Sequence, residues 1–327
     1  MANYRDIHGF QIEIRSDNPS NPVNGQVWYN TTDSKLKGAV VASVGGWSTG
    51  ANINTARKSL EGTGTSNTAA IAFGGTANPP VYALTEQYNG SAWTETADMN
   101  VGRTSTGAAG TSTAAIAFGG GDPSQSQVDE TELWNGTSWS ETADLNTARD
   151  NMGPTMAGTT TAALGAGGSP PTVAITEQWN GTSWTEVGDL NTARYSLAGA
   201  GTVTSGLVWG GAFPQKAQTE SWNGSAWTET ADLNIARYNF AGSGVSNTSA
   251  LAFGGQPGLA GSANETELWN GTSWSEQNNL NSARVSLTGT GTATASIVFG
   301  GEGPPPAQTL TEEWNDPNLT IKTVDTD

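Results

Sequence analysis

The sequence predicts an all-β protein, a six-bladed β-propeller of four-stranded blades, and three observations support this prediction. A pattern headed by Arg returns every 43 to 47 residues along a chain of 327 residues. Internal similarity with a period of 40 to 50 residues is typical of solenoids and propellers. Gly, Ser and Thr are too frequent for helices, and 13 Trp recur in a fixed pattern. Short strands packed through aromatic residues are therefore expected throughout.

Each repeat carries the same polar and aromatic residues at fixed positions. One Arg opens each repeat, at Arg57, Arg103, Arg149, Arg194, Arg237 and Arg284. A Thr-Glu pair marks the middle, with glutamates at Glu86, Glu132, Glu177, Glu220, Glu267 and Glu312. An aromatic residue and Asn come next, and a second Trp follows that aromatic residue by five positions in the first five repeats. This regularity indicates one structural unit per repeat.

The fourth repeat shows which strands a unit should contain. We expect strands at residues 194–202, 206–209, 218–222 and 226–231. Residues 223–224 are Asn-Gly, the strongest short signal for a tight hairpin turn. Four consecutive antiparallel strands form a propeller blade, and a ring of blades leaves only short edges exposed.

The composition of the strands indicates how the blades pack. The first strand of each repeat is rich in Gly and other small residues, which let backbones approach closely where the innermost strands converge. Paired aromatic residues such as Trp222 and Trp227 are expected to fill the space between blades. Each buried Trp removes roughly 150–250 Å² from water, so aromatic burial offsets a low aliphatic content.

The last repeat is incomplete, and the missing part lies near the N-terminus. After Trp314 the sequence lacks both the Asn-Gly turn and the second Trp. Trp47 precedes Trp93 by 46 residues, which is one repeat length. We therefore expect residues 47–53 to supply the outer strand of the last blade and so to close the ring.

The order of Arg, small residues, apolar strand, Gly-Gly, variable loop, Thr-Glu, aromatic residue, turn and Trp resembles the kelch repeat of galactose-oxidase-like propellers. The resemblance covers residues 47–316, within a predicted propeller domain at 47–327. The chain differs from that pattern in having Trp where Tyr is usual and a shorter turn before the final Trp. The resemblance implies the propeller fold, and these differences bear on the exact strand pairing.

Residues 1–46 are not a repeat and form a separate predicted segment. Strands are expected at residues 25–30 and 36–42, joined by a turn. The segment resembles a short hairpin near the start of many bacteriophage tail-fibre and other virion proteins, through the residues Pro22, Gly25, Trp28, Tyr29, Asn30, Thr31, Thr32, Leu36 and Lys37. Together with the repeats, it looks like part of a structural protein of tailed phages.

That resemblance implies a location and partners. The segment at 1–46 would attach the propeller to other virion proteins or to sister chains, which allows a homo-oligomer. The protein would then be found in the virion, after assembly in the bacterial host cytoplasm.

Composition excludes several classes of function. A formal net charge of -17 disfavours nucleic-acid binding, which needs clustered Lys and Arg. The sequence contains no run of about 18 apolar residues, so no membrane-spanning helix is predicted. Without Cys, and with His8 as the single His, the chain has neither a disulfide framework nor a Ser-His-Asp set in the repeats. We expect no cofactor, no metal and no catalysis, although two carboxylates in a groove can hydrolyse a glycoside.

The repeated Arg has two interpretations. It can form a cationic ring near the channel mouth that grips an anionic ligand, or it can pair with a repeat glutamate, as Arg194 with Glu220. Because all six repeats carry it and Arg suits bidentate carboxylate pairing, the structural interpretation is preferred. The Asn-Gly-Thr and Asn-Gly-Ser sequences also match glycosylation sites, but their fixed repeat position favours turns.

Loops after Gly-Gly differ between repeats, and variable loops on a fixed scaffold are where binding usually resides. Aromatic, amide and acid groups there suit sugar recognition, although plain solvent-exposed linkers are the alternative. The candidate contacts are Tyr82, Asp122, Asp129, Phe213, Lys216 and Gln218.

These observations predict a non-enzymatic phage protein, a tail-fibre or tail-tip adhesin that presents propeller loops to a host-surface glycan or receptor. One alternative is a purely structural virion component, a capsid decoration or baseplate spacer that binds other virion proteins. A cellular kelch-like interaction scaffold is a third hypothesis.

Overall fold

The computed structural model describes residues 12–18, 26–40, 45–154, 157–212, 214–258, 261–303, 307–316 and 320–323. These residues form strands and turns and contain no helix, so the predicted all-β class is confirmed. Among them there is accordingly no helix with the length and apolar character needed to cross a membrane.

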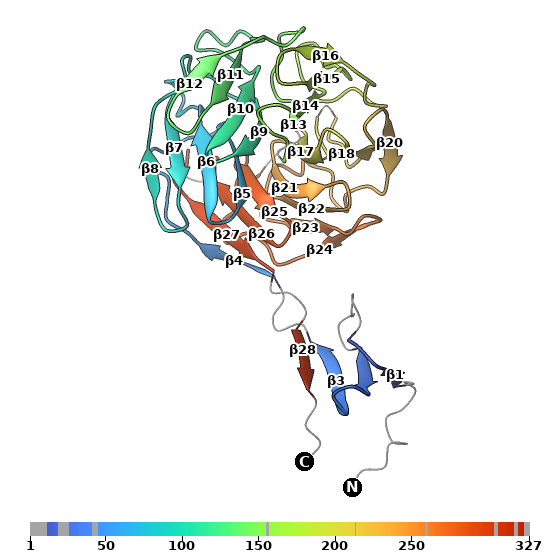
Figure 1. Cartoon of the computed structure of the whole chain (residues 1–327). Coiled ribbons are helices and arrows are strands. Elements are labelled where there is room, and N and C mark those ends of the chain that lie inside the picture. The colour runs from blue at the N-terminus through green and yellow to red at the C-terminus, as the bar shows by residue number, and fades with distance from the viewer. Residues whose placement is uncertain are drawn as a thin grey trace. The chain divides into compact units, whose positions relative to one another are not determined.

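Seven four-stranded sheets make up the described chain, and its contacts divide it into two units. The larger unit, residues 46–315, contains six of the sheets, each a run of antiparallel neighbours. In Figure 1 these six sheets surround a common centre, with β5, β9, β17, β21 and β25 nearest to it. The arrangement is that of a propeller-like all-β fold.

The first three sheets of the larger unit follow the chain in order. The first contains β5 (Glu61–Ser66), β6 (Ala69–Phe73), β7 (Thr85–Tyr88) and β8 (Trp93–Glu95). The second contains β9 (Gly107–Thr111), β10 (Ala114–Phe118), β11 (Thr131–Trp134) and β12 (Trp139–Glu141). The third contains β13 (Gly153–Pro154), β14 (Ala163–Ala166), β15 (Thr176–Trp179) and β16 (Trp184–Glu186).

The next three sheets repeat this order, except at the last strand. The fourth contains β17 (Ala198–Thr202), β18 (Ser205–Trp209), β19 (Thr219–Trp222) and β20 (Trp227–Thr230). The fifth contains β21 (Ala241–Ser246), β22 (Ser249–Phe253), β23 (Thr266–Trp269) and β24 (Trp274–Glu276). The sixth contains β25 (Thr288–Thr292), β26 (Ala295–Phe299), β27 (Thr311–Asn315) and β4 (Gly46–Thr49).

Three of the four strands predicted in the fourth repeat match the structure to within one residue at every boundary, but the first strand begins later than expected. It starts at Ala198 and not at Arg194. The reason is the backbone of Ser196, whose φ of 53° lies in the left-handed region and interrupts the extended chain. The Arg therefore precedes the strand and does not belong to it.

The core lies between neighbouring sheets, as predicted for the aromatic pairs. Each of the six hydrophobic clusters of the larger unit combines residues of two adjacent sheets. Trp274 of the fifth sheet, for example, packs on Trp209 of the fourth, with ring centroids 5.2 Å apart. Small residues on the inner strands make room for these rings, since a Cβ at Gly242 would collide with Trp209.

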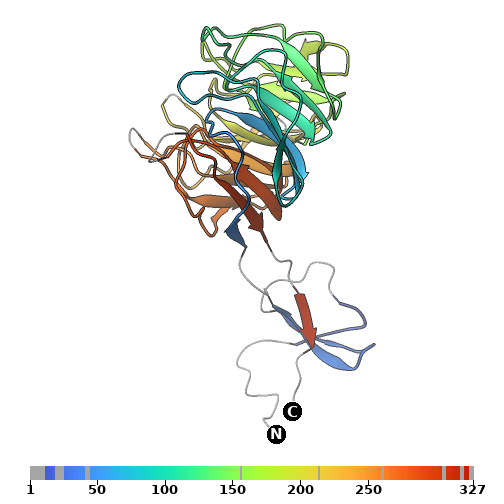
Figure 2. The same ribbon diagram turned by 90° about the vertical axis from the view of Figure 1, so that its left-hand side faces the viewer.

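The sixth sheet joins the two ends of the larger unit. Strand β4 pairs antiparallel with β27, so that Trp47 lies opposite Trp314 and Gly46 lies opposite Asn315. Both strands are seen side by side in Figure 2. The prediction that this N-terminal stretch pairs with the last repeat is confirmed for the strand Gly46–Thr49.

The two ends of each sheet differ in character. In the first sheet Phe73 pairs with both Glu61 and Thr85, so the loop after Gly-Gly and the start of the innermost strand lie at the same end. We call this end the loop face. The Asn-Gly turns lie at the opposite end, the turn face, because each connects the far ends of the third and fourth strands.

The smaller unit comprises residues 1–45 and 316–327. Its sheet contains β1 (Glu13–Arg15), β2 (Val27–Asn30), β3 (Lys35–Val40) and β28 (Thr320–Thr323), and the hairpin expected from the sequence is formed by β2 and β3. Strand β28 pairs with β3, so the C-terminal residues belong here and not to a repeat domain that extends to 327. Sequence reasoning missed this because one short strand outside the repeats carries no periodic signal.

Candidate functional site

The six repeat arginines form buried ion pairs with the glutamates of their own repeats. Arg194 donates from Nη2 to Glu220 at 2.9 Å and from Nη1 to the carbonyls of Gly210 and Gln218 at 3.1 and 2.6 Å. The corresponding pairs in the other repeats span 2.6 to 3.2 Å. Burial lowers the pKa of Arg194, and the Glu220 carboxylate opposes this shift.

These arginines leave no exposed guanidinium for an anionic ligand. Arg57, Arg194 and Arg237 are each 0% exposed, and the other three are 1% exposed. The pairing expected for Arg194 and Glu220 is present, and the same Glu220 also accepts two hydrogen bonds of 2.8 Å from Asn191. The bonds of each Arg to the residues at the two ends of a variable loop fix the base of that loop.

The structure separates the five candidate loop residues that it describes. Tyr82, Asp122 and Asp129 lie on the loops of the first two sheets, whereas Lys216 and Gln218 lie on the loop of the fourth. Phe213 lies outside the described residues, as does His8. Gln218 supports the fold, because its backbone carbonyl accepts a hydrogen bond from Arg194. Its side-chain oxygen is buried and has no hydrogen-bond partner.

A groove of about 650 Å³ lies between the loops of the first two sheets on the loop face. Of the six candidates it contains only Asp122. Its lining consists of Thr76, Asn78, Pro79, Val81, Thr104, Gly121, Asp122, Pro123, Gln125, Gln127 and Asp150. Its size falls within the range of about 300–1,000 Å³ that is usual for small-molecule sites.

The carboxylates of this groove are partly committed to its shape. Asp122 accepts hydrogen bonds of 2.8 Å at Oδ1 from the amides of Ser124 and Ser126, which shapes its own loop. Asp150 accepts from Ser169 at Oδ1, at 3.0 Å. In both residues these bonds involve Oδ1, which leaves Oδ2 as the acceptor to offer a ligand.

Gly121 keeps the groove open at its base. Its backbone exchanges two hydrogen bonds with Thr104, of 2.8 and 2.9 Å, and a Cβ at this position would meet Thr104 Oγ1 at 3.2 Å and Asp150 Oδ2 at 3.9 Å. The position has no left-handed φ, so a larger side chain can be placed here without backbone strain.

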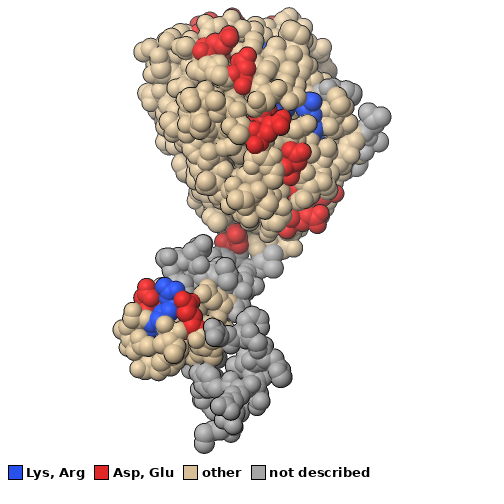
Figure 3. Space-filling view, turned by 90° about the vertical axis from the view of Figure 1, so that its right-hand side faces the viewer, with Lys and Arg blue, Asp and Glu red and all other residues tan. Residues whose placement is uncertain are grey.

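The groove offers hydroxyl, amide, carboxylate and apolar groups, and neither Lys nor Arg is among the described residues that line it. Acidic side chains are also spread over the side of the larger unit in Figure 3, where basic ones are few. An anionic ligand is therefore disfavoured here. A neutral ligand rich in hydroxyl groups suits the acceptors and donors, with Pro and Val available to its apolar faces.

A second cavity, of about 70 Å³, lies at the axis on the loop face. Six residues at one repeat position surround it, each with φ between 50° and 54°: Ser59, Ser105, Asn151, Ser196, Asn239 and Ser286. Each amide donates to the carbonyl of a counterpart in the neighbouring repeat, and the six bonds of 2.8–3.2 Å make a complete circuit. We call these six residues the axial ring.

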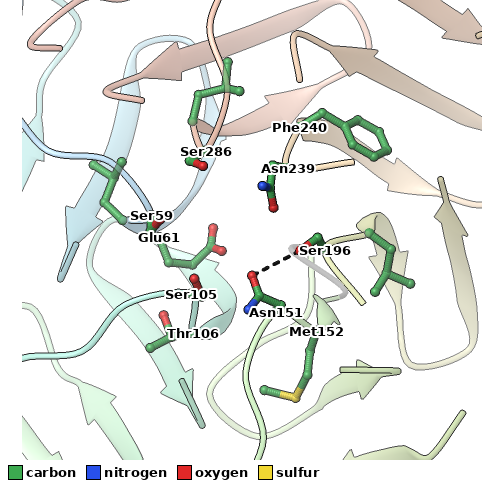
Figure 4. A pocket seen from close by; sticks show the side chains of 13 residues that line it. Ser59, Glu61, Ser105, Thr106, Asn151, Met152, Ser196, Asn239, Phe240 and Ser286 are labelled. Atoms are coloured by element: carbon green, nitrogen blue, oxygen red, sulfur yellow. Dashed lines mark hydrogen bonds between the residues drawn. The ribbon is translucent and has the colours of Figure 1, made fainter. Parts of the chain in front are cut away.

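Glu61 projects into the axial cavity, as Figure 4 shows. Its Oε1 accepts from Thr288 Oγ1 at 2.7 Å and from the amide of Gly62 at 3.0 Å. Burial raises the pKa of Glu61 to about 7, against the opposing effect of these two hydrogen bonds. Sequence reasoning missed this residue, although a comparison of the repeats four positions after each Arg would have found it.

No protein-family model matches the chain, and no curated protein matches it either. Among the residues that the structure describes, no group of three or more Asp, Glu, His or Cys side chains is placed to hold a metal ion.

Proposed function

We propose that the larger unit is a closed six-bladed kelch-like propeller that serves as a binding scaffold without catalytic activity. Two circuits of hydrogen bonds support closure. One is the backbone circuit of the axial ring. In the other, the second Trp of each sheet donates to the Thr of the neighbouring sheet at 3.0 to 3.2 Å, and Trp47 makes the bond that links the sixth sheet to the fifth.

The ligand that suits the loop face best is a neutral glycan. The observation that carries this proposal is the groove of about 650 Å³, in which uncommitted carboxylate oxygens, amides and hydroxyls lie beside Pro79, Val81 and Pro123. Vicinal sugar hydroxyls bond well to such acceptors and donors, and the apolar residues suit the C–H faces of a sugar ring. The absence of Lys and Arg among the described lining residues favours a neutral over an acidic sugar.

The biological setting that we propose is a tailed-phage virion, with the chain as a tail-fibre or tail-tip adhesin. Support comes from the resemblance of residues 1–46 to the hairpin of virion proteins, which would attach the chain to other virion proteins. The position of the two ends of the larger unit also supports this role. Gly46 and Asn315 are register partners at the turn face, so the links to the rest of the chain leave from the end opposite the variable loops.

A glycan-array screen of the full chain tests the proposal. Wild-type protein is expected to bind a set of neutral glycans, and Gly121→Leu, which fills the groove, is expected to lose at least tenfold in affinity. The control is Gly271→Ala, in an Asn-Gly turn on the turn face, where the added Cβ lies 3.3 Å from the carbonyl oxygen of Thr248 and the φ of 95° costs some stability.

The outcomes discriminate between the proposed roles. Glycan binding that survives Gly121→Leu places the ligand elsewhere and overturns the groove. An absence of glycan binding, combined with capture of the chain by purified phage particles that lack it, supports the structural virion role instead of adhesion.

A further inference from the structure

Glu61 is an exception within the repeat. It stands four residues after Arg57, and the five equivalent positions hold small side chains: Gly107, Gly153, Ala198, Ala241 and Thr288. Because five sister strands form at this position without a carboxylate, the fold does not need one here. The repeat thus provides its own control, and it points to a role for Glu61 other than folding.

The surroundings of Glu61 are polar and uncharged. The axial ring contributes four hydroxyls and the amides of Asn151 and Asn239, and both amide side chains point toward the carboxyl group in Figure 4. Within the ring, Ser196 Oγ donates to Oδ1 of its neighbour Asn151 at 3.3 Å. Apolar residues of the lining, such as Met152 and Phe240, point away from the centre.

No cation neutralises Glu61 within the described residues. It is the only titratable side chain among the described residues that line the cavity. The nearest basic residues along the chain are engaged elsewhere, Arg57 by Glu86 at 2.6 Å and Lys58 by Glu302 at 2.6 Å. An ionised carboxylate held in a partly enclosed site without a counter-ion is unfavourable, and a bound cation would relieve that cost.

The cavity has room for a small head group only. Its volume of about 70 Å³ is roughly twice the ~30 Å³ that a water molecule occupies in the liquid, and a sugar ring does not fit. A primary ammonium group carries three N–H donors, and the site offers a carboxylate together with hydroxyl and amide oxygens as acceptors.

We propose that the axial cavity binds a primary ammonium group, such as the end of a lysine side chain or of a small alkylamine. The Glu61 carboxylate is its counter-ion, and oxygens of the axial ring accept the remaining N–H bonds. The site is distinct from the glycan groove and does not depend on it. It gives the loop face a second specificity, for a cationic group inserted along the axis.

Calorimetric titration of the full chain with n-propylammonium chloride at pH 8 tests this site, with ionic strength held constant by NaCl. Saturable binding with one site per chain is expected. Affinity should fall at least tenfold at pH 5, where Glu61 is protonated while the ammonium group, with a pKa near ~10.4 for a lysine-type amine, stays charged.

Glu61→Gln should lose at least tenfold in affinity at pH 8, whereas the matched variant Glu95→Gln, which removes an exposed carboxylate of β8, should bind as the wild type does. Glu61→Ala repeats the test with the residue that two sister repeats already carry at this position. A wild-type circular dichroism spectrum and a single cooperative urea transition ensure that each variant is folded.

Three results would overturn the proposal. The first is no binding above the NaCl background. The second is equal affinity in the folded Glu61→Gln or Glu61→Ala variants. The third is equal affinity for n-propanol, which lacks the charge, or for KCl, which lacks the N–H donors.

Discussion

At the scale of single residues, one set of polar side chains solves the same problem in all six repeats. A buried Arg needs a carboxylate and further acceptors, because an unpaired buried charge is costly. The repeat glutamate supplies the carboxylate, two backbone carbonyls accept from Nη1, and an Asn three positions before the Arg satisfies the second carboxylate oxygen. The set therefore acts as a unit, and the loss of the Arg or of the Glu leaves the other charge buried without its counter-ion.

Arg194→Met should destabilise the larger unit by about 3–5 kcal/mol, because it leaves the Glu220 carboxylate buried without its cation. Urea denaturation followed by tryptophan fluorescence measures the effect. Lys58→Met is the control, since the pair of Lys58 with Glu302 is partly exposed and such pairs contribute about 0–1 kcal/mol. Equal midpoints for the two variants would contradict the structural role of Arg194.

Glu61 makes a contribution to stability that depends on pH. Burial raises its pKa from 4.5 to about 7 in the folded protein. The folded state therefore binds the proton more tightly than the unfolded state, and stability falls as the pH rises from about 4.5 to about 7. Above that range the loss is complete.

The variant Glu61→Gln lacks this titration. The free energy of unfolding of the variant minus that of the wild type should increase by on the order of 3 kcal/mol from pH 4.5 to pH 8, measured in the absence of amines. Paired urea titrations at the two pH values give the difference. A constant difference between the two proteins across this range would mean that the Glu61 pKa is not raised.

At the scale of single elements, the outermost strand of each sheet carries a Trp that contacts both its own sheet and a neighbouring one. Trp227 packs on Trp222 of its own sheet and donates to Thr176 of the neighbouring sheet at 3.0 Å. Strand β4 follows the same pattern from the other end of the sequence, since Trp47 contacts Trp314 and Phe253 and donates to Thr266. A four-residue strand thus contributes a Trp to the interface between the fifth and sixth sheets.

Trp47→Ala and Trp227→Ala should each lower the free energy of unfolding by about 3–5 kcal/mol, as expected for a buried Trp replaced by Ala. The comparison tests closure, because the two residues occupy equivalent positions although only Trp227 is continuous in sequence with its sheet. If Trp47→Ala leaves the urea midpoint unchanged while Trp227→Ala lowers it, β4 is dispensable and the ring is open.

At the scale of the whole molecule, the larger unit begins and ends within one sheet. Gly46 and Asn315 are opposite each other, where the other sheets have an Asn-Gly turn between the third and fourth strands. In the proposed closed ring, the ends of the larger unit could therefore lie in the equivalent turn of any other sheet. The formal net charge of -17 acts on the molecule as a whole and disfavours association between copies through like-charge repulsion.

A circular permutant tests this view of the ring. Asn315 is joined to Gly46 through Gly-Thr, which restores the repeat turn, and new ends are placed in the turn between Gly224 and Ser225. The melting temperature of the permutant should lie within about 5 °C of that of residues 46–315. One tight turn is added and an equivalent turn is cut, while every strand keeps its partners. Failure of the permutant to fold would contradict the closed arrangement.

The candidate sites could be predicted from the sequence only in part. Asp122 is expected from its variable loop and does line the groove, but Thr76 and Asp150 come from two other repeats, which only the packing of neighbouring sheets brings together. Gln218 was chosen as a contact, yet its backbone anchors Arg194. A loop's composition does not reveal which of its side chains face a neighbouring loop.

The sequence by itself determined the all-β class, three of the four strands of the fourth repeat and the pairing of Arg194 with Glu220, because the repetition of residue types along the chain is a local pattern. It also identified the stretch that pairs with the last repeat, since Trp47 keeps the repeat spacing. Only the tertiary structure assembled the axial ring and the groove. Both consist of residues from different repeats, and their geometry depends on left-handed backbone at Ser59 and its counterparts and on how neighbouring sheets pack.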